Sequence, residues 1–332
     1  MEITIIDVAK VSGYSVSTVA KALNDNNVIK KETRDKVREV ADRIGYTPNL
    51  IAKNLVKKKT EVIGLIVTDI TNPFFAEFTM SVEQRAREKK YKVLLCISDN
   101  NVDLEKAYIQ TFLEARVEGI IIAPIYRNDA DRTHLWELKR RKVPFVLNRN
   151  IPGLEASYVC ADYKKGYYEI TKHLIELGHR KIALLSPFAI SEVLEGYKMA
   201  LDEYNIPYIG KYIIESGTGF EGGFAPAEEI CKMSDKPTAI LTGNDIIAFG
   251  VLQVFARYSI NVPDDISLAS FDDVKLASLA QIPLTTQAQP IDELGRASVD
   301  LLMDMIESKS TKCEKIILPT KLIIRKSCKR IE

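Results

Sequence analysis

The sequence contains few of the residues that usually build metal, redox or catalytic sites. Its 332 residues include only three histidines, five cysteines and one tryptophan. The cysteines are odd in number and far apart in the chain, so we expect free thiols rather than disulfides or a zinc site. The histidines have none of the spacings typical of metal ligands, and we expect neither a bound metal nor a catalytic histidine.

Long apolar runs are absent as well. Glu2, Asp7 and Lys10 interrupt the first ten residues, which argues against an apolar signal segment there. No stretch approaches the roughly 20 apolar residues that a membrane helix needs. We therefore expect no membrane partner and a cytoplasmic location.

The sequence also lacks the fingerprints of nucleotide cofactors and of common catalytic sites. Gly217-Thr218-Gly219 and Gly222-Gly223 have neither the strand–turn–helix setting nor the following lysine of a phosphate-binding loop. No serine elbow, metal motif or paired catalytic carboxylates stand out. We therefore predict that the chain has no cofactor and is not an enzyme.

Net charge is only +1, but it is unevenly distributed along the chain. Residues 1–60 hold 12 Lys and Arg against 7 Asp and Glu, a net charge of +5, whereas the remainder carries −4. A basic N-terminal segment followed by a mildly acidic body is typical of a protein in which only that segment contacts phosphate.

The basic segment has the pattern of three short helices. Thr4 with Asp7 fits a capping box at the start of the first helix, and Gly13 fits its end. Ser15 fits the cap of a second helix from Val16 to about Leu23, with Thr18 at its third position. A third helix is expected over residues 31–44, ended by Gly45.

The second helix has two different faces. Val16, Val19 and Leu23 have the spacing of an inward-facing stripe, while Ser17, Thr18 and Lys21 are left on the outer face. Two helices joined by a glycine turn form a helix-turn-helix, whose second helix fits the major groove of DNA. The same pattern also occurs in small domains that do not bind DNA, so the pattern alone leaves both interpretations open.

From Glu61 onward, apolar runs alternate with helical segments, which predicts parallel sheets covered by helices on both faces. About 270 residues are too many for a single sheet, so we expect two similar lobes with a cleft between them. The expected strands are 62–67, 92–98, 119–124, 144–147, 181–186, 239–242 and 266–269, and the first expected helix is 75–90.

The N-terminal segment resembles the LacI/GalR family of transcription regulators over residues 3–59. The residues that carry the resemblance stand in the family's order and spacing. They are Ile6-Asp7-Val8-Ala9, Gly13, Ser15, Ser17-Thr18-Val19, Leu23-Asn24, Thr33-Arg34 with Val37, Gly45-Tyr46 and Pro48-Asn49.

This resemblance implies that some of these residues contact bases and others contact phosphates. Val16, Ser17 and Lys21 would read base edges, with Lys21 suited to guanine and Val16 to a thymine methyl group. Asn24, Thr33 and Arg34 would hold phosphates and fix the register. Ala20, Lys21 and Lys30 depart from the residues usual in the family, which leaves the operator sequence open. The complete set of expected DNA contacts is Thr4, Ser15, Val16, Ser17, Thr18, Lys21, Asn24, Thr33, Arg34, Asn49, Ala52 and Leu55.

The segment 48–60 corresponds to the family's hinge helix. Pro48 favours a helix start, and residues 49–56 can form about two turns, which are marginal alone in water. The resemblance implies that Leu55, with Ala52 beside it, wedges between base steps in the minor groove next to its dimer mate. An ordinary core leucine is the alternative for Leu55.

Residues 61–326 resemble the periplasmic-binding-protein type I fold. The resemblance implies a head at 1–47, a hinge at 48–60 and an effector-binding and dimerisation core at 61–332. Within the core, lobe one would cover about 61–161 plus 290–320, and lobe two about 162–289.

Polar and aromatic residues follow the expected strands, and parallel sheets bind ligands at that edge. Amide and charged groups can bond vicinal hydroxyls, and an aromatic ring can cover a sugar face. Phe74 and Phe75 could instead be core, and Asp272 could cap a helix. The expected effector contacts are Asn72, Phe74, Phe75, Asn148, Arg149, Asn244, Asp272 and Gln289.

The resemblance also suggests the effector and the mechanism. Relatives place an arginine shortly before the helix expected near Gly196-Tyr197, but residues 191–195 contain none. We therefore expect a neutral sugar or polyol, with a phosphorylated metabolite, a partner protein or a transport role as alternatives. Phe220 is the candidate aromatic lid. Ligand binding would close the lobes of a homodimer and change the spacing of its hinges, and either induction or corepression is compatible with this.

Overall fold

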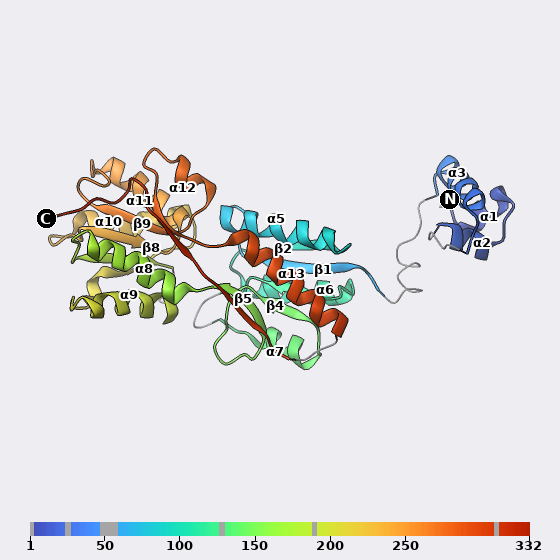
Figure 1. Cartoon of the computed structure of the whole chain (residues 1–332), viewed down its shortest axis with the longest axis horizontal. Coiled ribbons are helices and arrows are strands. Elements are labelled where there is room, and N and C mark those ends of the chain that lie inside the picture. Colours follow the sequence, from blue (N-terminus) through green and yellow to red (C-terminus); the bar gives the residue numbers. More distant parts are fainter. Residues whose placement is uncertain (1–2, 24–27, 47–58, 126–129, 188–190, 309–311) are drawn as a thin grey trace. The chain divides into compact units, whose positions relative to one another are not determined.

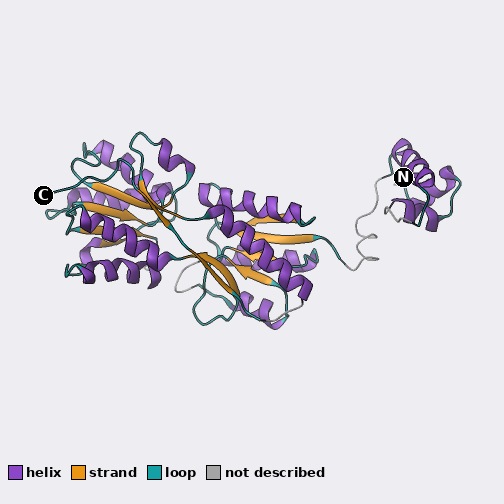
Figure 2. Cartoon of the chain, viewed as in Figure 1, coloured by secondary structure: helices purple, strands orange, loops and turns teal. Residues whose placement is uncertain are grey.

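The computed structural model describes residues 3–23, 28–46, 59–125, 130–187, 191–308 and 312–332. The chain divides into two compact units, Met1–Thr60 and Glu61–Glu332. Figure 1 labels the helices and some of the strands, and Figure 2 distinguishes helices from strands by colour.

The smaller unit is a three-helix cluster. Helices α1 (Ile5–Ser12), α2 (Val16–Leu23) and α3 (Lys31–Ile44) pack around a small apolar core. The carboxylate of Asp7 accepts hydrogen bonds from the backbone N–H and hydroxyl of Thr4, at 2.9 and 2.7 Å, and so closes the expected capping box.

The glycine expected at the end of α1 and the serine cap expected at the start of α2 are both confirmed. Gly13 ends α1 with φ 75°, a left-handed conformation that glycine adopts without strain. The hydroxyl of Ser15 accepts from the backbone N–H of Thr18 at 3.2 Å and caps α2. Lys30 provides no side-chain cap for α3. This agrees with the expectation that Lys30 stands where the family usually has a hydroxyl residue.

The inward orientation expected for Val16 is wrong. Val19 and Ala22 form the buried face of α2, whereas the side chain of Val16 is 43% exposed. Val16 is the first residue of the helix and lies outside the apolar cluster that α1 and α3 complete. Its exposure leaves it on the surface beside Ser17 and Lys21.

The larger unit contains two six-stranded sheets. The first has the strand order β11-β5-β4-β3-β1-β2 and the second β12-β10-β9-β8-β6-β7. Neighbouring strands are parallel except for β10 and β12, which run antiparallel. The first sheet consists of β1 (Val62–Val67), β2 (Lys92–Ile97), β3 (Ile120–Ile122), β4 (Phe145–Leu147), β5 (Ser157–Ala161) and β11 (Lys315–Leu318). The second consists of β6 (Ile182–Ser186), β7 (Ile213–Glu215), β8 (Ala239–Thr242), β9 (Ser267–Asp272), β10 (Thr285–Ala288) and β12 (Lys321–Ile323).

Successive side chains of a strand point to opposite faces of its sheet, so each sheet has buried side chains on both faces. Helices therefore cover both faces of each sheet. On the first sheet, α5 and α13 pack against one apolar cluster, while α6 and α7 pack against another. On the second sheet, α8 and α9 cover one face and α10 and α11 the other. The helices are α5 (Pro73–Glu88), α6 (Val102–Glu114), α7 (Thr133–Arg140), α8 (Tyr163–Glu176), α9 (Ser191–Glu203), α10 (Phe224–Lys232), α11 (Asp245–Arg257), α12 (Lys275–Leu279) and α13 (Ile291–Ser308), with short 3-10 turns η1 (Gly210–Tyr212) and η2 (Phe220–Gly223).

The chain passes between the two sheets three times. It crosses after β5, after β10 and between β11 and β12 (Figure 1). The expected α/β architecture of two parallel-sheet lobes is therefore present, and each lobe is built from segments that are distant in sequence. No helix in the described part of the chain is long and apolar enough to cross a membrane.

Candidate functional sites

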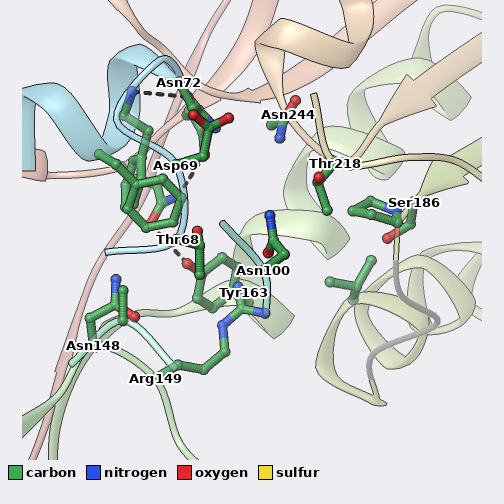
Figure 3. Close-up of a pocket in the computed structure, with 18 of the residues that line it drawn as sticks. Thr68, Asp69, Asn72, Asn100, Asn148, Arg149, Tyr163, Ser186, Thr218 and Asn244 are labelled. Atoms are coloured by element: carbon green, nitrogen blue, oxygen red, sulfur yellow. Dashed lines mark hydrogen bonds between the residues drawn. The ribbon is translucent and has the colours of Figure 1, made fainter. Parts of the chain in front are cut away.

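All eight residues expected in the cleft line one cavity of about 140 Å³ in the larger unit. The cavity lies where the carboxyl ends of strands from both sheets face each other, the edge at which parallel sheets bind ligands. Figure 3 shows Asn72, Asn148 and Arg149 on one side and Ser186 and Thr218 on the other. The first-sheet side also contributes Thr68, Asp69, Phe74, Phe75, Asn100, Ala123 and Pro124, and the second-sheet side contributes Tyr163, Tyr167, Pro187, Val193, Gly243, Asn244, Asp272 and Gln289.

The segment after β1 brings an amide and two aromatic rings to the cavity. Asn72 caps α5, and its side-chain oxygen accepts from the backbone N–H of Phe74 at 3.0 Å. The rings of Phe74 and Phe75 meet edge to face, with centroids 5.1 Å apart. Phe74 is buried in the apolar cluster under α5 as well as lining the cavity, so it serves both as core and as cavity wall.

Asp272, the last residue of β9, has an unusual backbone conformation at the start of the following turn. Asp272 has φ 111° and Asp273 has φ 59°, two consecutive positive values at residues other than glycine. Such conformations are costly and persist where surrounding contacts hold them. The side chain of Gln289 donates to the Asp272 carboxyl at 2.6 Å. Neither aspartate caps α12, because Val274 is its N-cap residue, so the helix-cap alternative for Asp272 is wrong.

Burial controls the ionisation of Asp272. Desolvation raises the pKa of its carboxyl well above the usual range, and the negative charge of Asp245 raises it further. The hydrogen bond from Gln289 and the positive charge of Arg149 oppose this effect. A protonated Asp272 can donate to a ligand hydroxyl as well as accept from one.

Asp245 holds this turn from behind the cavity, a role that sequence reasoning missed. Its carboxyl is fully buried and accepts from the hydroxyls of Ser270 and Thr286, the latter at 2.8 Å. It also accepts from the backbone N–H of Val274 at 2.8 Å. Burial raises the pKa of Asp245 to about 6, against the effect of these hydrogen bonds. The sequence signal available was its place at the start of a helix beside Asn244.

Arg149 and Tyr163 connect the two sides of the cavity. The guanidinium of Arg149 lies 4.1 Å from the centroid of the Tyr163 ring. The Tyr163 hydroxyl donates to the side-chain oxygen of Gln289 at 3.2 Å. The rings of Tyr163 and Tyr167 both stack on Phe271, with centroids 5.6 and 4.6 Å away. Tyr163 was not among the expected site residues, because a tyrosine in a helix pattern reads as core.

Several helices begin beside or in the cavity, and three of them have an N-cap residue whose side chain caps the helix. Asn72 caps α5, and Asn244 caps α11 by accepting from the N–H of Ile247 at 2.9 Å. Asp162 caps α8 by accepting from the N–H of Lys165 at 3.0 Å. A helix N-terminus attracts anions through free N–H groups, and these side chains already occupy part of that capacity.

The second-sheet side differs from two expectations. Helix α9 begins at Ser191, five residues before the start expected near Gly196. Phe220, the candidate lid, does not line the cavity and instead packs edge to face on Phe224 at 5.4 Å. Thr218 reaches the cavity from the same loop.

The head places its expected DNA contacts on the surface. Thr4, Ser15, Val16, Ser17 and Lys21 are exposed. Three others, Thr18, Thr33 and Arg34, are partly buried. Asn24, Asn49, Ala52 and Leu55, with most of the expected hinge, lie outside the described residues. The described residues contain no group of three or more His, Cys, Asp or Glu that could hold a metal ion.

Comparison with known proteins identifies both units. Residues 4–49 match the family model "Bacterial regulatory proteins, lacI family", and residues 171–328 match "Periplasmic binding protein-like domain". Catabolite control protein A of Priestia megaterium is 33% identical over 99% of this chain and 100% of its own. The chain belongs to the LacI family of bacterial regulatory proteins. It is a DNA-binding transcription regulator with a two-lobed α/β core.

Two solved structures of LacI-family proteins show the same fold. A lac repressor dimer bound to operator and the anti-inducer ONPF superposes with a TM-score of 0.87 at 26% identity, covering 98% of this chain and 99% of that one. A LacI-family regulator of Enterococcus faecium with bound ribose has a TM-score of 0.70 at 30% identity, covering 82% of this chain and 100% of that one.

Proposed function

We propose that this LacI-family regulator is a repressor that binds a near-palindromic operator as a homodimer, under the control of a neutral sugar or related polyol in the cavity. The observation that carries the proposal is the convergence of eight strand-end residues from both sheets on one cavity. Amide, hydroxyl and carboxyl groups there can form paired hydrogen bonds to vicinal hydroxyls, and Phe75 supplies an aromatic surface.

Charge in the cavity supports a neutral ligand over an anionic one. Among the described residues that line the cavity, Asp69 and Asp272 have carboxyl side chains and Arg149 is the one basic residue. The guanidinium of Arg149 already stacks on Tyr163. The N-termini of α5, α8 and α11 have side-chain caps, which reduces their attraction for phosphate. A phosphorylated metabolite would therefore meet the carboxyl of Asp69 and, among the described residues, a single guanidinium that already stacks on a tyrosine ring.

The head would recognise DNA through the exposed surface of α2. Val16, Ser17 and Lys21 would contact bases, while Thr33 and Arg34, with Asn24, would contact phosphates. Thr4, Ser15 and Thr18 shape the ends of α1 and α2 that approach the DNA backbone. Two copies of this head suit the two half-sites of a palindrome.

The domain division that we propose is a head at 1–47, a hinge at 48–60 and a core at 61–332. Within the core, lobe one contains the first sheet with α13, and lobe two contains the second sheet with α8. The chain crosses three times between the sheets. A ligand that contacts both sheets can therefore change the orientation of one lobe relative to the other. The hinge, with Asn49, Ala52 and Leu55, would transmit that change to the operator.

This mechanism involves binding and no chemical step, so we propose that the protein is not an enzyme and acts in the cytoplasm, where its operator is. The regulators to which it is similar are not named as enzymes. A phosphorylated metabolite or a partner protein is the second candidate effector, because Arg149 lines one wall of the cavity.

Two experiments test the proposal. The full-length protein is used to select sequences from a random DNA pool at a stated salt concentration, and a near-palindrome is expected. Calorimetry then compares a panel of sugars with their phosphates on the same protein. Tighter binding of the phosphates would favour the second candidate, and failure to enrich any sequence, with or without sugars, would contradict operator binding.

A further inference from the structure

One corner on the second-sheet side of the cavity has apolar side chains. Val193 lines it from the first turn of α9, is 3% exposed and belongs to the apolar cluster that contains Tyr167 and Tyr197. Pro187 and the Tyr167 ring line the same second-sheet side of the cavity. Val193, Pro187 and Tyr167, the described residues of this corner, therefore offer no charged group to a ligand.

Neither the Tyr167 hydroxyl nor position 243 offers this corner a polar side-chain group. The hydroxyl of Tyr167 donates to the backbone oxygen of Gly243 at 3.1 Å and is not free to bond a ligand. A side chain cannot replace Gly243, because its Cβ would lie 2.8 Å from Cδ of Pro187. The sequence from Ser186 to Glu195 contains no lysine or arginine.

The opposite wall has the reverse character. Thr68, Asp69, Asn72, Asn100 and Asn148 all reach the cavity from the first sheet. Figure 3 shows Thr68, Asp69 and Asn72 together on that side, across from Ser186 and Thr218. The cavity is therefore polar on one wall and apolar at the corner of Val193.

We propose that the ligand of this cavity presents hydroxyl groups to the first-sheet wall and a hydrocarbon edge to Val193 and Pro187. The chemical class that fits is a deoxysugar, such as a 6-deoxyhexose, whose methyl group replaces a hydroxymethyl group. This inference rests on the proposed function, because it specifies the kind of sugar. A methyl group against Val193 gains from apolar burial, whereas a hydroxyl there loses water and finds no hydrogen-bond partner on Val193 or Pro187.

The test measures binding to matched pairs of sugars by calorimetry with the full-length protein. The pairs are L-fucose and L-galactose, L-rhamnose and L-mannose, and 6-deoxy-D-glucose and D-glucose. The deoxy member of at least one pair should bind between about 10- and 100-fold more tightly than its parent, the range that one buried hydroxyl produces in an apolar pocket. The variant Val193→Thr places a hydroxyl at the corner and should bring this ratio close to one.

Two further variants separate recognition from folding. Val254→Thr makes the same change at a fully buried position of α11 that does not line the cavity, and it should keep the wild-type ratio. Val193→Ala keeps the corner apolar and should keep the preference for the deoxy sugar even if overall affinity falls.

Each outcome distinguishes the inference from the function on which it rests. Equal or tighter binding of the oxygenated sugars, or binding confined to sugars outside these pairs, would overturn the inference and leave the proposed function standing. An unchanged ratio in Val193→Thr would also overturn it. Absence of binding to any sugar would contradict the proposed function itself.

Discussion

Gln289 and Asp272 are joined by a 2.6 Å hydrogen bond at the ends of two neighbouring parallel strands, β10 and β9. Gln289 also accepts from Tyr163, against which Arg149 of the first sheet is stacked. Asp272 is thus one end of a chain of contacts that reaches the other lobe. A ligand that binds Asp272 also acts on the segment where the chain passes from one sheet to the other.

Replacing Asp272 tests this assignment directly. Asp272→Ala removes a buried carboxyl that can both donate to and accept from a ligand hydroxyl, at about 0.5–1.5 kcal/mol for each hydrogen bond, so ligand affinity should fall by roughly 5- to 100-fold. The response to ligand in an operator-binding titration should disappear while operator binding without ligand stays intact. Asp272→Asn, which can still accept from Gln289, should lose less. An unchanged response in Asp272→Ala would remove this residue from the site.

Asp245 should make stability depend on pH in an unusual direction. Its pKa is raised by burial to about 6, above the roughly 3.9 of an exposed aspartate. The folded protein then holds this proton more tightly than the unfolded chain, so its contribution to the free energy of unfolding falls as pH rises from about 4 to 6. Asp245→Asn lacks this titration. Urea denaturation at several pH values should show the wild-type value falling relative to the variant, and parallel curves would contradict the prediction.

An ion pair should stabilise the strained turn that carries Asp272. The guanidinium of Arg325 lies 2.7 Å from the Asp273 carboxylate and also donates to the backbone oxygen of Leu284 at 2.9 Å. Arg325→Ala should lower the free energy of unfolding by about 1–2 kcal/mol, because the pair is only partly exposed.

A second substitution should restore part of this loss. Asp273 has φ 59°, a conformation that asparagine tolerates well, and Asp273→Asn also removes the unpaired charge. The double variant Arg325→Ala/Asp273→Asn should therefore be more stable than Arg325→Ala alone in thermal denaturation. A double variant less stable than Arg325→Ala would show that the ion pair does not support the turn.

The head should show two kinds of DNA contact. Arg34→Ala should weaken binding to all sequences about equally and reduce the slope of log affinity against log salt by about 1, because it removes one phosphate contact. Lys36→Ala is the matched control on the same helix, at a position that is not an expected contact. Lys21→Ala should instead relax sequence preference at one operator position. Equal effects of Arg34→Ala and Lys36→Ala would contradict the assignment of Arg34.

The sequence predicted best those elements that are apolar throughout. Val62–Val67 was expected as a strand with the bounds that it has, because five of its six residues are buried and apolar or glycine. The strand β10 was not expected, since Thr285-Thr286-Gln287 reads as polar although all three are fully buried. Their side chains are satisfied by partners distant in sequence, such as Asp245 for Thr286 and Glu169 for Gln287. Such partners cannot be read from a local pattern.

Some residues of the cavity could be predicted from the sequence, and others could not. Residues directly after expected strands, such as Asn72 and Asp272, were found because strand ends share one edge. Tyr163 and Val193 were missed because they lie on helices whose orientation toward the cavity depends on the packing of α8 and α9. Val16 was wrongly predicted to face inward, because periodicity shows which face of α2 a residue occupies. It does not show how far along α2 the contacts with α1 and α3 extend.

Both sheets are completed by strands that follow α13. β11 forms one edge of the first sheet, and β12 forms one edge of the second. During synthesis on the ribosome, therefore, neither sheet can acquire its last strand until nearly the whole chain has emerged, although most of the first sheet is made much earlier. A premature stop near residue 312 would leave an unpaired strand edge on each lobe and expose β5 and β10 to association with other chains.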